Sequence, residues 1–303
     1  MPADRPLSQK TAGTHHQAET LAAEFPPLMV AAERVASTVS QGVHGRRRVG
    51  QGETFWQFRR YQFGDSTQLI DWRQSAKSQP VYIRETEWEA AQTVWLWRDG
   101  SASMEYRSVP DIPTKEERAD LLALALASLL VRGGERTALQ ETGMTPGASR
   151  AVLTRMWSII EGKRLPTGSL PSVELLPRYG RVVWFGDFLS PLDEVRTVLN
   201  AYADQGIRGH IVQILDPAEE LLPYEGRVLF QGPEDDDGNV LVAHVSSVRD
   251  DFRREIENHK SALQALARSL GWSFMTHRTD HSPETVLLAL YLNLSESVGD
   301  KLC

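Results

Sequence analysis

An aspartate and two serines stand at alternate positions in Asp99-Gly100-Ser101-Ala102-Ser103, directly after residues 93–97, which are predicted to form a strand. One carboxylate and two hydroxyls on a tight turn can converge on one point, and hard divalent cations prefer such oxygen ligands. In open α/β sheets, ligands bind at the carboxyl ends of the strands. The pattern therefore predicts a metal site, with Mg²⁺ as the natural candidate and Mn²⁺ or Ca²⁺ as substitutes. The plainer alternative is an Asp/Ser turn that caps the next helix.

A second acid stands in an equivalent place. Residues 182–185 are apolar and predicted to be a buried strand, and Gly186-Asp187 follows directly. Two carboxylates at the same edge of neighbouring strands repel each other unless a cation or protons lie between them. We therefore expect Asp99 and Asp187 to share a cation. That expectation fails if the two loops lie far apart or if a lysine amine fills the gap.

Three other groups of polar residues invite functional interpretations. Residues 235–238 lack the spacing of a calcium loop and fit a hairpin turn between strands at 228–231 and 240–245. His277 and His281 are four apart, a spacing that binds zinc on a helix, but a predicted strand and Pro283 argue against a helix there. The third group is a set of arginines interleaved with aromatic residues, which could bind nucleic acid but more simply forms ion pairs; its members are Arg46, Arg47, Arg48, Arg59 and Arg60, with Asp65, Asp71 and Glu85 as the expected partners.

The composition argues against several classes of protein. The 303 residues suffice for one large domain or two moderate ones, and a net charge of −7 gives no overall footprint for nucleic acid or an anionic membrane. The single cysteine is Cys303, so no intrachain disulfide or cysteine-rich zinc site is expected. Residues 121–131 are apolar but too few to span a membrane, and residues 1–16 lack the apolar core of a signal peptide. We expect a cytoplasmic protein with no membrane span and no nucleic-acid partner.

The expected elements form an α/β fold with a parallel central sheet and helices on both faces. Residues 1–17 are predicted to be a mobile leader, and residues 18–90 to contain two short helices joined at Pro26-Pro27 and a β-containing module with extended pieces at 55–61 and 81–87. Residues 91–303 form the α/β domain. Its predicted strands are 93–97, 137–140, 181–185, 209–215 and 272–276, and its predicted helices are 115–132, 150–161, 192–205, 250–270 and 286–294.

The sequence resembles the prokaryotic family called domain of unknown function 58 (DUF58), whose members contain a von Willebrand factor type A-like domain. The resemblance is closest over residues 42–104, and it is carried by the segments 50–55, 59–65 and 70–77 and by the motif at 99–104. It implies a Rossmann-like domain and a metal-ion-dependent adhesion site made of Asp99, Ser101, Ser103 and Asp187. A threonine completes such a site, and Thr167 occupies the plausible loop, although Ser169 would serve chemically as well.

The resemblance also implies a function. In such domains the cation keeps one coordination position open for a carboxylate of a partner protein, and family members are commonly encoded with a MoxR-type ATPase of the AAA class. We therefore expect a non-enzymatic interaction module that works with a MoxR-type ATPase and a protein client. Many relatives carry membrane-spanning segments, and this chain shows none. The alternatives are a metal-dependent phosphoester hydrolase and a metal-free scaffold that binds through its arginine and aromatic module.

Overall fold

A computed structural model describes residues 27–44, 55–61, 70–77, 80–86, 92–178, 180–232 and 238–296. Its centre is a five-stranded parallel sheet in the order β4-β3-β5-β6-β9. The strands are β3 (Thr93–Arg98), β4 (Arg136–Leu139), β5 (Arg181–Gly186), β6 (Arg208–Leu215) and β9 (Ser273–Arg278). The predicted α/β alternation is thereby confirmed. The chain runs outward in opposite directions from β3 and β5, so these two neighbours mark the point where the strand order reverses.

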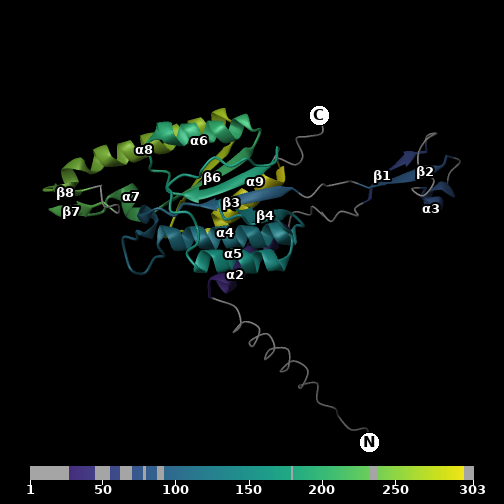
Figure 1. The fold of residues 1–303 in the computed structure, drawn as a ribbon, viewed down its shortest axis with the longest axis horizontal. Coiled ribbons are helices and arrows are strands. Elements are labelled where there is room, and N and C mark those ends of the chain that lie inside the picture. The colour runs from purple at the N-terminus through teal and green to yellow at the C-terminus, as the bar shows by residue number, and fades with distance from the viewer. Residues whose placement is uncertain are drawn as a thin grey trace, which may run out of the picture.

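Helices cover both faces of the sheet (Figure 1). One face carries α2 (Pro27–His44), α4 (Lys115–Arg132), α5 (Arg150–Glu161) and α9 (Pro283–Glu296), and the other carries α6 (Leu192–Asp204) and α8 (Val245–Ser269). Helix α4 packs between the sheet and the three other helices of its face, so it is buried nearly all round. This burial explains the apolar stretch at 121–131, which belongs to a core helix.

Large aromatic side chains fill the core on the α6 and α8 face. Trp184 on β5 packs edge-on against Trp272 and Tyr202, with ring centroids 4.8 Å and 5.1 Å away, and Trp97 lies against Trp184 at 6.4 Å. Such edge-to-face pairs add to the free energy gained from burial. Trp97 and Trp184 are paired in the β3–β5 ladder, so these contacts stabilise the two strands close to their carboxyl ends.

Some element boundaries differ from the sequence prediction. Helix α8 begins at Val245, so residues 243–245 do not continue strand β8 (Asn239–Val242), which pairs with β7 (Val228–Gln231) as predicted. The short helices η2 (Ala102–Glu105) and α7 (Pro217–Leu221) were not predicted. Helix α2 starts at Pro27, which suits a proline in the first turn. The predicted leader at 1–17 and the first of the two predicted short helices lie outside the described residues.

A separate two-stranded sheet precedes the α/β domain in the sequence. Strands β1 (Phe55–Arg60) and β2 (Tyr82–Thr86) pair antiparallel, which confirms the two predicted extended pieces, and α3 (Trp72–Ser75) follows Asp71. The side chain of Asp71 accepts a hydrogen bond from the backbone N–H of Gln74 at 2.8 Å and so caps α3. No ion pair between Asp71 and an arginine occurs in the described part of the chain. The other expected acidic partners, Asp65 and the Glu85 side chain, lie outside it.

Candidate functional site

The two predicted acids lie side by side at the carboxyl edge of the sheet. Asp99 follows β3 and Asp187 follows β5, its direct neighbour in the sheet. The backbone N–H of Asp99 still donates to the carbonyl of Phe185, at 2.8 Å, so the two loops leave the sheet together. This is the position where the strand order reverses, and in sheets of this kind a crevice opens there.

Hydrogen bonds tie each of two predicted serine ligands to one of the acids. The N–H and Oγ of Ser101 both donate to Oδ1 of Asp99, at 2.9 Å and 2.6 Å. The hydroxyls of Ser101 and Ser103 are 3.0 Å apart, and Ser103 Oγ donates to Oδ2 of Asp187 at 2.6 Å. The alternation that suggested convergence in the sequence therefore does bring these oxygens together.

Two glycines allow this close approach. A Cβ on Gly100 would lie 2.0 Å from the carbonyl oxygen of Pro166, and a Cβ on Gly186 would lie 2.9 Å from Cβ of Asp99. Neither position can accept a larger residue without backbone movement. Loop 166–168 consequently rests directly against the turn at residues 99–101, and the N–H of Gly100 donates to the carbonyl of Gly168 at 3.3 Å.

The same loop brings Thr167 to the site, with its side chain exposed. Ser169, the other candidate, accepts a hydrogen bond from Ser190 at 3.1 Å. The hydroxyl of Ser169 is therefore engaged in a hydrogen bond with the loop after β5. Of the two, Thr167 is the one whose backbone contacts the Asp99 turn.

A lysine that the sequence analysis did not single out lies next to these acids. Lys115 is the first residue of α4, placed there by a capping box between Thr114 and Glu117, and its side chain is fully buried. Its Nζ donates to Oδ2 of Asp187 at 2.8 Å and to Oε1 of Glu219 at 2.6 Å. Burial alone would lower the pKa of Lys115, but the two carboxylates raise it above its ordinary value, so the amine stays charged.

Glu219 reaches Lys115 from α7. Asp216 and Glu219 form a second capping box, in which Glu219 Oε2 accepts from the N–H of Asp216 at 2.8 Å. The other oxygen of Glu219 is thereby directed at Lys115. Burial raises the pKa of Glu219 despite the opposing effect of the lysine. The sequence signal was present in Asp216-Pro217-Ala218-Glu219, which has the residue types of a capped helix start.

A lysine amine at the acid pair is the result stated above to count against a shared cation, and Lys115 meets that condition in part, because it is hydrogen-bonded to Asp187 but not to Asp99. Asp99 is completely buried, and its Oδ2 has no hydrogen-bond partner in the described part of the chain. Burial, and next the charge of Asp187, raise the pKa of Asp99 to about 7, against the lowering effects of Ser101 and Lys115. The lysine therefore lies on one side of the acid pair, and the deficit of positive charge is concentrated at Asp99.

The donor set fits a hard divalent cation on the Asp99 side. If Asp99, Asp187, Glu219 and Lys115 are all ionised, three negative charges and one positive charge leave −2, which one divalent cation would neutralise. The oxygen chemistry of the carboxylates and hydroxyls suits Mg²⁺. No group of three or more His, Cys, Asp or Glu side chains able to hold a metal ion occurs among the described residues. The candidate site consists of two acids supplemented by hydroxyls.

The two histidines singled out in the sequence do not form a site. His277 lies on β9 and is buried, whereas His281 lies in the turn after that strand and is largely exposed, so the pair is not on one helix face. Gly238 directly precedes β8, as the predicted hairpin turn requires, while residues 233–237 lie outside the described part. In the described residues, no helix is long and apolar enough to cross a lipid bilayer.

Comparison with known proteins assigns a family. The family described as "Protein of unknown function DUF58" matches residues 57–262, which is more than half of the chain. Uncharacterized proteins from Mycobacterium tuberculosis and Mycobacterium bovis are each 25% identical over 285 residues, covering 86% of this chain and 85% of theirs. A further uncharacterized protein, from Mycobacterium avium, is 28% identical over 149 residues, covering 49% of this chain and 81% of its own.

Solved structures were also matched. A conserved hypothetical protein, BatB, from Bacteroides thetaiotaomicron aligns with a TM-score of 0.38 and 13% identity, covering 69% of this chain and 100% of its own. An aerotolerance-related membrane protein from Bacteroides fragilis aligns with a TM-score of 0.31 and 16% identity, covering 60% of this chain and 99% of its own.

Proposed function

Because this chain belongs to the DUF58 family, whose function is unknown, we propose its role from the site itself. The α/β domain is a von Willebrand factor type A-like interaction module that binds a divalent cation at the ends of β3 and β5. It binds a partner protein through that cation and is not an enzyme. The cation is Mg²⁺, with Mn²⁺ or Ca²⁺ as possible substitutes.

The buried, unpartnered Oδ2 of Asp99 carries this proposal. A buried polar atom without a partner is costly, and a buried carboxylate is costlier still. Asp99 can be satisfied by a proton or by a cation, and its raised pKa shows how poorly the surroundings compensate its charge. The hydroxyls of Ser101 and Ser103 lie beside it. The contact of Ser101 is to Oδ1 of the same carboxylate, so these hydroxyl oxygens could help to coordinate a cation on that side of Asp99.

Each residue of the site would have its own role in cation binding. Asp99 would bind the ion directly, with the hydroxyls of Ser101 and Ser103 beside it and Thr167 approaching from loop 166–168. Asp187 would contribute mainly charge, because its Oδ2 already accepts hydrogen bonds from Ser103 and Lys115. The bound ion would supply an open coordination position that a carboxylate of a partner protein can fill.

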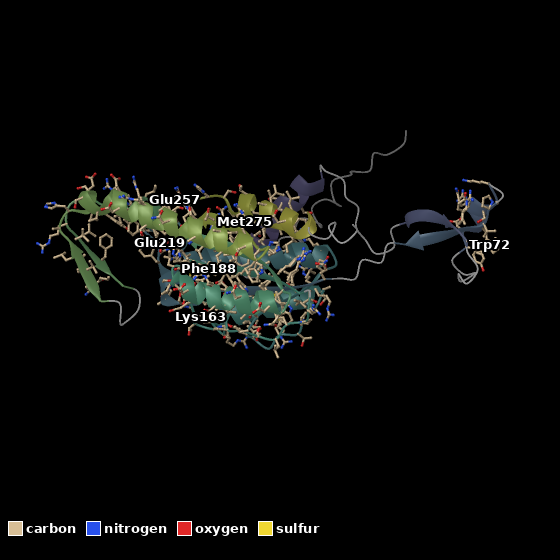
Figure 2. The ribbon with its side chains drawn as sticks, turned by 90° about the horizontal axis from the view of Figure 1, so that it is seen from above. Trp72, Lys163, Phe188, Glu219, Glu257 and Met275 are labelled. Atoms are coloured by element: carbon tan, nitrogen blue, oxygen red, sulfur yellow. The ribbon has the colours of Figure 1, made fainter. Side chains whose placement is uncertain are left out.

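An exposed apolar surface near this edge supports a role in protein recognition. We call it the apolar rim; it consists of Tyr106, Val109, Leu221, Leu229 and Leu241. The loop after η2 is tied to the region of α7 by a hydrogen bond from the N–H of Ser108 to Asp216 at 2.9 Å. The β7–β8 hairpin projects beyond the α/β body on the side of Glu219 (Figure 2). Exposed apolar side chains are used at protein interaction sites when they lie together, so these residues are the ones we expect a partner protein to contact.

The partner would be a MoxR-type ATPase of the AAA class, acting with this chain on a protein client in the cytoplasm. The family resemblance supports this part of the proposal, because family members are commonly encoded with such an ATPase. Capture from native lysate, with and without chelator, tests it. Recovery of an AAA-class ATPase only when cation is present is the expected result, and equal recovery with chelator would remove the cation from the interaction.

The position of Lys115 supports one alternative function, that of a metal-free scaffold in which the lysine is the permanent counter-ion of the acids. Metal-dependent phosphoester hydrolysis is less well supported. His259, the histidine that reaches the loop after β5, has its Nε2 2.7 Å from the carbonyl oxygen of Phe188. A carbonyl can only accept, so this nitrogen must donate and is not free to act as a general base there.

A thermal melt tests the cation site. Mg²⁺ should raise the melting temperature of the wild-type chain, because a ligand that binds only the folded state stabilises it. Asp99→Ala removes the direct ligand and should abolish the shift, while Ala102→Ser, an exposed change within the same turn, should retain it. Equal Mg²⁺ stabilisation of wild type and Asp99→Ala would reject the assignment.

A further inference from the structure

The loop after β5 contains a bulky residue with a left-handed backbone. Phe188 has a φ of +50°, and the residue is only 1% exposed. A bulky side chain in this backbone region is strained, so it persists only where its surroundings hold it. The ring of Phe188, labelled in Figure 2, packs into the core 6.3 Å from the ring of Trp97. The strain lies directly beside Asp187, and strained residues of this kind gather at functional sites.

The peptide group between Phe188 and Leu189 is hydrogen-bonded on both sides. Its carbonyl oxygen, on Phe188, accepts a hydrogen bond from Nε2 of His259 at 2.7 Å. Its N–H, on Leu189, donates to Oδ1 of Asp187 at 3.2 Å. Because a peptide group is planar, its C=O and N–H turn together. The contact that holds the carbonyl therefore also directs the N–H at Asp187.

Both oxygens of the Asp187 carboxylate are thereby held. Oδ2 accepts hydrogen bonds from Ser103 and Lys115, at 2.6 Å and 2.8 Å, and Oδ1 accepts from the N–H of Leu189. A carboxylate is rigid and flat, so a contact that fixes one oxygen also fixes the direction of the other. The N–H of Leu189 therefore helps to keep Oδ2 directed at Ser103, on the side of the site where Asp99 lies.

Helix α8 supplies the histidine at the start of this series of hydrogen bonds. His259 is half-buried on α8, and the next residue, Lys260, pairs with Glu220 on α7 at 2.8 Å. Glu220 in turn follows Glu219, the residue that reaches Lys115. Two consecutive residues of α8 thus hold the two segments that border the site, which are the loop after β5 and α7.

We propose that His259 is a positioning residue of the cation site. It acts through the peptide group between Phe188 and Leu189, whose N–H orients the carboxylate of Asp187, and it is not a ligand of the ion. Hydrogen bonds in series polarise one another, so the bond from His259 also makes the N–H of Leu189 a better donor. This inference rests on the proposed function, because it concerns the affinity of the same site for Mg²⁺.

Isothermal titration calorimetry of the full chain with Mg²⁺ tests this role. His259→Leu removes the donor and should weaken Mg²⁺ binding about tenfold, the effect of losing one orienting hydrogen bond. His259→Gln presents an amide N–H over a similar reach and should bind Mg²⁺ within about twofold of wild type. The matched control is Asn258→Ala, an exposed change at the preceding residue of α8, which should leave the affinity unchanged.

Hydrogen exchange of the Leu189 amide, followed by NMR in the presence of chelator, tests the peptide link without a cation. Exchange should be faster in His259→Leu than in wild type, and His259→Gln should restore the slower rate. His259→Asn keeps an amide but is one methylene shorter, so it should behave like His259→Leu. A general loss of stability would instead speed exchange throughout α6 and α8. Circular dichroism verifies that each variant is folded.

Three results would overturn this role, and they can be told apart. Equal Mg²⁺ affinity of wild type and His259→Leu would remove the role of His259 and leave the cation site intact. Equally weak binding by His259→Gln and His259→Leu would show that the imidazole contributes by packing and not by donating. No Mg²⁺ binding by wild type would overturn the proposed function and the role of His259 together.

Discussion

Replacing Lys115 by methionine tests how much the lysine charge compensates the acids of the candidate site. Methionine has nearly the length of lysine and suits a buried position, but it lacks the ammonium that donates to Asp187 and Glu219. Breaking a buried ion pair from one side costs about 3–5 kcal/mol, because an uncompensated charge remains. The Glu219 side chain is 18% exposed and can be partly hydrated. We therefore expect the free energy of unfolding to fall by about 3 kcal/mol, the lower end of that range.

The same variant should respond more strongly to Mg²⁺. Without Lys115, the formal charge of the remaining acids Asp99, Asp187 and Glu219 is −3 rather than −2, and Oδ2 of Asp187 loses a competing donor. Tighter cation binding by a factor of ten would add about 1.4 kcal/mol of stabilisation at saturating ion. Urea unfolding with Mg²⁺ or chelator, at constant ionic strength, measures the increment for wild type and for Lys115→Met.

The double variant Lys115→Met with Glu219→Gln provides the control. It removes one uncompensated carboxylate, so part of the lost stability should return while Asp99 is untouched. An equal Mg²⁺ increment in wild type and Lys115→Met would refute the idea that lysine and cation compensate the same acids. No Mg²⁺ increment in either protein would establish Lys115 as the permanent counter-ion and support the metal-free scaffold.

Three further predictions follow from individual contacts. Gly100→Ala places a Cβ 2.0 Å from the Pro166 carbonyl oxygen and should cost about 1–3 kcal/mol in urea unfolding and reduce the Mg²⁺ response; an unchanged melt would contradict the close packing of the two loops. Ser103→Ala should cost about 1–2 kcal/mol through the lost hydrogen bond to Asp187, and Ser103→Thr should restore most of it in the same measurement. Burial first, and then Arg118 and His281, lower the pKa of His277 from 6.5 to about 4, so the unfolded chain takes up a proton before the folded one does. Stability should therefore decline as the pH falls from about 6.5 toward 4, by at most about 1.4 kcal/mol per pH unit, and less steeply in His277→Gln; parallel pH curves would show that His277 does not cause the decline.

The elements that could be predicted from the sequence are those whose signals are local. Helices α4 and α5 begin and end where the apolar spacing and the flanking residues place them, with Gly133 and Gly162 directly after their last residues. Strand β5 reads as a continuous apolar run because both of its faces are covered by helices. Helix α7 was missed because it spans only five residues, although its capping box was visible in the sequence.

The candidate site likewise contains residues that local sequence signals predict and residues that they do not. Asp99, Ser101 and Ser103 lie within one turn, and Asp187 ends a strand that the apolar pattern locates, so the sequence predicts their meeting. Lys115 and Glu219 are 104 residues apart and meet only because α4 and α7 both begin at this edge of the sheet. No local pattern shows that a lysine at the start of α4 is buried, since a lysine in that position is ordinarily solvated.

The position of Lys115 sharpens the electrostatic argument that the sequence suggests. If one lysine were shared equally by Asp99 and Asp187, little uncompensated negative charge would remain for a cation to neutralise. Instead, Lys115 bridges Asp187 and Glu219, and the partnerless oxygen belongs to Asp99, which also has the raised pKa. The lysine thus holds Asp187 and the start of α7 in place. The negative charge that remains uncompensated is that of Asp99, beside Ser101 and loop 166–168. On our proposal, a cation bound there would neutralise Asp99 in place of a proton, so ion binding at neutral pH would release a proton from a group with a pKa of about 7.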